Sequence, residues 1–125
     1  MYMVMYVLDD PNLLDELLES LCAVGVTGAT IVESTGMHRR RARVTRPHFR
    51  FPFEGRMNSQ LEDNLTMFVI VPDQEAVRVC LGAIEQVVGD LAGPRNGILA
   101  AWPLEVAKGL RIAPAGSLCT EEEAQ

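Results

Sequence analysis

Residues 2–24 read YMVMYVLDDPNLLDELLESLCAV, and this stretch decides the fold class. Its first part, Tyr2–Leu8, is apolar, aromatic and partly β-branched, which predicts a strand. Asp10 then suits the N-cap of a helix, and Pro11 suits the first helical position, where a missing N–H needs no partner. Leucines recur after it at spacings of three and four, so we expect an amphipathic helix that ends at Gly25.

The second half of the chain repeats this order. Leu65–Val71 reads LTMFVIV and predicts a strand, followed by Asp73 as the N-cap of a second amphipathic helix that ends at Gly89. Thr27–Thr35 and Ile98–Trp102 predict a strand after each helix. The order strand, helix, strand, strand, helix, strand is that of an α+β, ferredoxin-like βαββαβ sandwich with both helices on one face of an antiparallel sheet.

The length of 125 residues fits one domain. We expect this domain to span residues 1–111, with a long loop at residues 37–63 between the second and third strands. Residues 112–125 are small and acidic, which predicts a flexible acidic tail.

Both faces of the expected sheet are apolar. In the first strand, Met3, Met5 and Val7 alternate with residues that are equally apolar, and the third strand repeats the pattern with Phe68 and Ile70. Helices cover only one face of such a sheet, so the other would be a larger apolar patch than monomers usually expose. The sequence therefore predicts an obligate oligomer.

Charge is distributed unevenly along the chain. Residues 38–56 contain seven arginines and one acidic residue, whereas the rest of the chain holds four basic and sixteen acidic residues. A segment of net charge +6 on a body of −12 is a candidate for contact with an anionic ligand or an acidic protein surface. The alternative is an exposed arginine-rich hairpin that only aids solubility.

Several classes of protein are disfavoured. No apolar run is long enough to cross a bilayer and the first residues lack a signal-peptide pattern, so we expect a cytoplasmic protein. No P-loop, nucleophile elbow, HExxH or GxGxxG motif is present, so we do not expect an enzyme. Phe49, Phe51 and Phe53 interleave with arginines as in some nucleic-acid-binding segments, but the pI of about 4.8 argues against a polyanionic partner.

One family resemblance joins these features. Residues 25–40, GVTGATIVESTGMHRR, resemble the second-strand signature of the P-II nitrogen-regulatory signal proteins, Gly-Val/Ile-x-Gly-Met-Thr-Val-x-Glu-x-x-Gly followed by Phe-Gly-Arg-Gln. Pro11, residues 69–73 (VIVPD), Gly97 and residues 103–105 (PLE) also stand where that family has similar residues. The resemblance covers roughly residues 2–111.

The resemblance implies a ferredoxin-like homotrimer. Each cleft between subunits would bind a nucleotide, and a long loop would contact a target protein. One side of the cleft would be formed by Gly28, Ala29 and Thr30. The other contacts would come from Gly36, Met37, Arg39, Asn96, Gly97 and Arg111. The loop residues that face the target protein would be Arg40, Arg41, Arg43 and Arg46.

Three positions depart from the family pattern. Ile98, Asn64 and Gly109 stand where the family has basic residues that grip phosphate or line the site. Each lost charge-assisted contact costs about 1.5–3 kcal/mol, which weakens binding of ATP. Either the ligand is smaller, such as AMP, ADP or cyclic AMP, or neighbouring arginines compensate. The candidates for compensation are Arg40, Arg41 and Arg95.

A second family offers an alternative with the same fold. A CutA-like trimer would have a metal-tolerance or purely structural role. His38, His48 and the three cysteines lack the close spacing of metal ligands, so we predict no metal site.

Overall fold

The computed structural model of the chain describes residues 1–37 and 64–110. Within these residues the elements are β1 (Tyr2–Leu8), the 3-10 turn η1 (Pro11–Leu13), α1 (Leu14–Ala23), β2 (Thr30–Ser34), β3 (Asn64–Val71), α4 (Gln74–Val88) and β4 (Ile98–Pro103). The expected loop at residues 37–63 and the expected tail at 112–125 lie almost entirely outside them, and both stay predictions.

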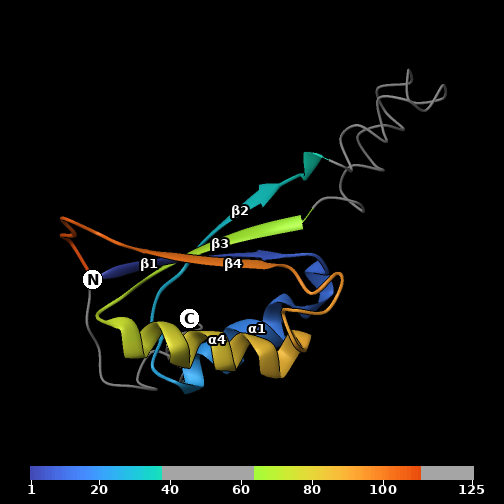
Figure 1. Cartoon of the computed structure of the whole chain (residues 1–125), viewed down its shortest axis with the longest axis horizontal. Coiled ribbons are helices and arrows are strands. Elements are labelled where there is room, and N and C mark those ends of the chain that lie inside the picture. The colour runs from blue at the N-terminus through green and yellow to red at the C-terminus, as the bar shows by residue number, and fades with distance from the viewer. Residues whose placement is uncertain (38–63, 111–125) are drawn as a thin grey trace, which may run out of the picture.

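The four described strands form one antiparallel sheet in the order β2-β3-β1-β4. Both helices lie on the same face of it (Figure 1). The protein is therefore an α+β sandwich whose strand order is compatible with the predicted ferredoxin-like arrangement. The register of the central pair, from Tyr2 opposite Val71 to Leu8 opposite Leu65, places alternate residues of both strands on the helix side.

The predicted boundaries of α4 are confirmed, whereas Asp10 and Pro11 begin the 3-10 turn η1, and α1 follows from Leu14 to Ala23, two residues before Gly25. The Asp10 carboxylate accepts a hydrogen bond from the backbone N–H of Asn12 at 3.0 Å. Asp73 accepts one from the N–H of Ala76 at 2.8 Å. Each side chain thus satisfies a backbone donor that a helix start leaves open.

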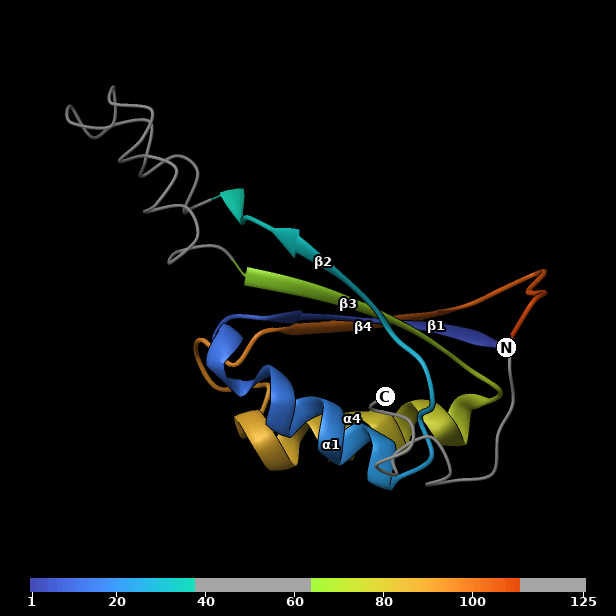
Figure 2. The same cartoon turned by 180° about the vertical axis from the view of Figure 1, so that it is seen from behind.

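The second strand is shorter than the sequence predicts. We expected it to begin at Thr27, but β2 begins at Thr30. The backbone N–H of Val26 still bonds to the carbonyl of Leu21 at the end of α1, so the chain is held in the helix layer up to that point. Residues 27–29 connect the helix layer to the sheet, so the strand begins only after them (Figure 2).

The core lies between the sheet and the helices. Tyr6, Leu17 and Ile84 are fully buried there, together with alternate residues of β1 and β3. The Ser20 hydroxyl donates to the carbonyl oxygen of Ala83 at 2.8 Å and links the two helices. Burial of side chains of this size contributes about 1.5–3 kcal/mol each, so this layer is the main hydrophobic core of the described residues.

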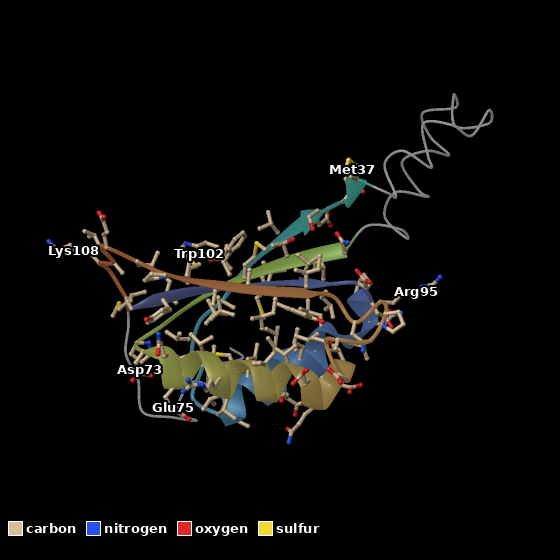
Figure 3. The ribbon with its side chains drawn as sticks, in the orientation of Figure 1. Met37, Asp73, Glu75, Arg95, Trp102 and Lys108 are labelled. Carbon is tan, nitrogen blue, oxygen red and sulfur yellow. The ribbon has the colours of Figure 1, made fainter. Side chains whose placement is uncertain are left out.

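The opposite face of the sheet has no covering layer among the described residues, although it is apolar. Trp102 projects from it, away from the helices (Figure 3). Alternation along the strands places apolar side chains from all four strands on this face. They are Met3, Met5 and Val7 from β1, Val32 from β2, Phe68 and Ile70 from β3, and Ile98 and Trp102 from β4. Exposure reaches 64% at Ile98, 46% at Val32 and 40% at Trp102. We call this surface the open face.

Candidate functional site

A groove of about 760 Å³ lies at one end of the sheet, between the segment that precedes β2, the end of β3 and the first turns of α4. Three residues predicted to form one side of a cleft, Gly28, Ala29 and Thr30, line it. Gly109, one of the positions that departs from the family pattern, lies in the same lining. The structure therefore brings the first predicted group of site residues together with the C-terminal end of the described chain.

The lining of this groove is mostly apolar. Its lining includes Phe68, Ile70 and Leu110, together with Thr27 and Thr30. Cys80, which also lines the groove, has an exposed fraction of 1%, and burial raises the pKa of its thiol to about 11. The thiol is therefore neutral near pH 7 and is not a nucleophile there. Such a lining suits an aromatic or aliphatic group with a few hydrogen-bonding atoms.

Two residues of the second predicted group, Asn96 and Gly97, lie in the turn that leads into β4. The Tyr6 hydroxyl donates a hydrogen bond to the carbonyl oxygen of Asn96, and the Asn96 amide donates to the carbonyl oxygen of Asp90. Gly97 has a φ of 96°. A side chain there would overlap the carbonyl oxygen of Val7 and lie 2.6 Å from the Tyr6 hydroxyl oxygen. Packing against β1 therefore requires glycine at this position.

The role of Tyr6 was not predicted, because only the register of β1 and β4 brings this residue to the turn. Burial, reinforced by the negative charge of Asp9, raises the pKa of Tyr6 to about 12. The phenol is thus a hydrogen-bond donor throughout the physiological pH range. It holds the turn at residues 94–97 in one place.

Two other predicted glycines have no such explanation within the described chain. A Cβ atom built at Gly28 or Gly36 meets no described atom within 4 Å. Neither residue has the left-handed backbone conformation that favours glycine. The fold of the described residues therefore does not require glycine at these positions. A ligand or another chain that approaches the backbone closely would require it, because glycine leaves space for such an approach.

The two predicted groups lie at opposite ends of the sheet. Gly28, Ala29 and Thr30 are at the end where β3 finishes, whereas Gly36, Met37, Asn96 and Gly97 are at the end where β3 begins. The eight residues of β3, at about 3.3 Å each, separate these ends by roughly 25 Å. One copy of the chain therefore does not bring both groups to one ligand.

The second group is itself divided between the two edges of the sheet. Gly36 and Met37 follow β2 at one edge, and Asn96 and Gly97 precede β4 at the other, with β3 and β1 between them. Three strand spacings amount to about 14 Å. Met37 is 76% exposed, and its side chain contributes little to the packing of the described chain.

A polar cluster fastens β2 to β3 where residues 38–63 leave the sheet. The Ser34 hydroxyl lies 2.9 Å from Oδ1 of Asn64 and 2.7 Å from the hydroxyl of Thr66. Ser34 has one proton, so Thr66 donates to Ser34 when Ser34 donates to Asn64. Asn64, which stands where the family has a basic residue, is only 7% exposed. Its amide fixes the ends of the two strands and brings no positive charge to this site.

The remaining predicted residues, Arg39 and Arg111 of the cleft and Arg40, Arg41, Arg43 and Arg46 of the loop, lie outside the described residues. Within residues 1–37 and 64–110, no group of three or more histidine, cysteine, aspartate or glutamate side chains is placed to hold a metal ion. Within the same residues, no helix has the length and apolarity needed to span a membrane.

Comparison with known proteins returned no matching family model and no matching curated protein.

Proposed function

We propose that the protein is a regulatory protein of the P-II type that acts as a homotrimer and is not an enzyme. In this proposal each cleft between copies binds an adenine nucleotide or another small anion. The loop arginines Arg40, Arg41, Arg43 and Arg46 contact a target protein. Ligand binding in the cleft then controls access of the loop to that target.

The observation that carries this proposal is the division of the predicted site residues between opposite ends of the sheet. A ligand that contacts both Gly28 and Gly97 requires two copies of the chain, arranged so that one end meets the other. The strand order and the resemblance of residues 25–40 to the P-II signature support the same arrangement.

The open face supplies the driving force for such an assembly. Burial of apolar surface contributes about 25 cal/mol per Å², so covering this face stabilises each copy by several kcal/mol. A trimer with threefold rotational symmetry closes on itself, so none of its interface surfaces is left without a partner. Each copy then has one neighbour at each side, which creates three equivalent clefts.

Calorimetry with AMP, ADP, ATP and cyclic AMP tests the proposal, and Gly28→Ala is the decisive variant. A Cβ atom at Gly28 meets no described atom within 4 Å, so the variant should fold as the wild type does and lose at least tenfold in nucleotide affinity, because the added methyl group occupies the cleft. Gly82→Ala is the matched control, since Gly82 also has free space around it but lies within α4.

Three results would count against the proposal. Absence of saturable heat with all four nucleotides would remove the nucleotide site. Equal affinity in Gly28→Ala and the wild type would show that the site lies elsewhere. Saturable binding of zinc or copper without any response to nucleotides would favour the CutA-like alternative.

A further inference from the structure

We propose that Arg95 is the phosphate-binding cation of the cleft and takes the place of the basic residue that is absent at Ile98. This inference deepens the proposed function and rests on it. It begins with the backbone, because Arg95 has a φ of 65° and is the only described residue other than glycine with a positive φ. Side chains disfavour that left-handed conformation, which persists where the surrounding structure enforces it.

The surrounding structure does enforce it. Tyr6 and Asp90 fix the backbone and side chain of Asn96 on one side of Arg95. Before it, the N–H of Gly93 bonds to the carbonyl of Asp90 at 2.9 Å. After it, Gly97 is wedged against β1. The turn is therefore rigid, and it presents Arg95 in a defined direction.

The guanidinium of Arg95 has no partner of its own in the described part of the chain. The ion pair found there joins Arg78 to Glu75 at 3.4 Å, at the other end of the molecule. Arg95 is exposed and extends outward from the end of the sheet at which Met37 also lies (Figure 3). A strained backbone that directs an unpaired cation to a predicted ligand site is typical of a ligand contact.

Nearby carboxylates make the cation necessary for an anionic ligand. Asp9 is close enough to influence the Tyr6 hydroxyl, and the Asp90 carboxylate accepts a hydrogen bond from the N–H of Ala92 at 2.9 Å, so both acids lie near the turn. Their negative charges oppose the approach of phosphate. Arg95 offsets them and offers a planar pair of donors that fits two phosphate oxygens.

The test measures folding and binding in Arg95→Asn, because asparagine accepts the left-handed conformation but carries no charge. We expect the thermal midpoint to rise by about 2–5 °C as the strain is relieved. ADP should bind about ten- to hundredfold more weakly, whereas the response to adenosine, weak or absent, should equal that of the wild type. Arg95→Lys should retain part of the ADP affinity.

Arg78→Gln is the control, since it removes an exposed arginine distant from the turn and should leave ADP affinity unchanged. A wild type that binds ADP and an Arg95→Asn variant that binds it equally well would overturn this inference and leave the proposed function standing. A wild type that binds no nucleotide would overturn both.

Discussion

On the face of the sheet that packs against α1 and α4, every second residue of β1 from Val4 onward is buried, and Tyr6 is fully inaccessible. On the open face the intervening residues of the same strand are equally apolar, yet they are only half-buried. The side chains of the two faces thus have similar chemistry, and the difference between them is the presence of a covering layer. An apolar surface that residues 1–37 and 64–110 leave uncovered is typical of a surface that another chain covers.

A charge on the open face should have the largest effect. Met5 lies near the centre of this face, opposite Phe68 and Ala100. Met5→Arg would bury an unpaired cation between copies, at a cost of about 3–5 kcal/mol, or at least a hundredfold in the dissociation constant of the oligomer. Sedimentation velocity should detect dissociated chains in place of the oligomer.

Val79→Arg is the matched control for this variant. Val79 is 37% exposed on α4, on the outer side of the helix layer, so a charge there should leave the oligomer intact. If Met5→Arg and Val79→Arg both sedimented as the wild type does, the open face would not be an interface.

A cavity on the covered face should destabilise the protein slightly less than Met5→Arg destabilises the oligomer. Leu17 is fully buried between the helices and the sheet, and Leu17→Ala should lower the free energy of unfolding by about 3 kcal/mol. Urea denaturation followed by circular dichroism measures this loss. The decrease in the free energy of unfolding caused by Leu17→Ala should be the same at low and high protein concentration. The effect of Met5→Arg should instead depend on concentration, because that variant changes the association of the copies. A loss below about 1 kcal/mol would mean that this layer is not the core.

Alkaline pH should lower the free energy of unfolding gradually, because two buried groups on the covered face lose their protons. Burial raises the pKa of Cys80 from 9.0 to about 11 and that of Tyr6 from 10.0 to about 12. The folded protein holds these protons at pH values where the unfolded chain has released them, so stability is complete below about pH 9 and falls between pH 9 and 12. In Tyr6→Phe the fall between pH 10 and 12 should be shallower in thermal melts. Identical slopes in the two proteins would contradict the burial of this phenol.

Glycine in the helix layer should give the smallest effect, with the opposite sign. Gly82 lies inside α4 with free space around it, so Gly82→Ala should raise the free energy of unfolding by about 1 kcal/mol. Gly97→Ala should instead destabilise, because its side chain would overlap β1. Thermal melts of the two variants compare them directly, and equal shifts would show that the turn at Gly97 is not tightly packed.

Much of this fold could be predicted from local patterns. The N-caps Asp10 and Asp73, the helix ends at Gly25 and Gly89 and the apolar runs of β1 and β3 each depend on residues close together in the chain. These short-range signals were enough to give the order of the elements and the expectation of a sheet with two apolar faces.

Contacts between distant residues were not predicted. Tyr6 and Asn96 are 90 residues apart, and only the pairing of β1 with β4 reveals that one anchors the other. The late start of β2 follows from the distance between the helix layer and the sheet, which no local pattern encodes. The candidate site was predicted as a set of residues, but its division between the two ends of the sheet required the structure.

The mass of the native protein in solution tests the central claim most directly. Sedimentation equilibrium at micromolar concentration should give about 41 kDa, three times the 13.8 kDa of one chain. A stable, folded particle of 13.8 kDa would show that the open face needs no cover, and it would contradict both the trimer and the clefts between its copies.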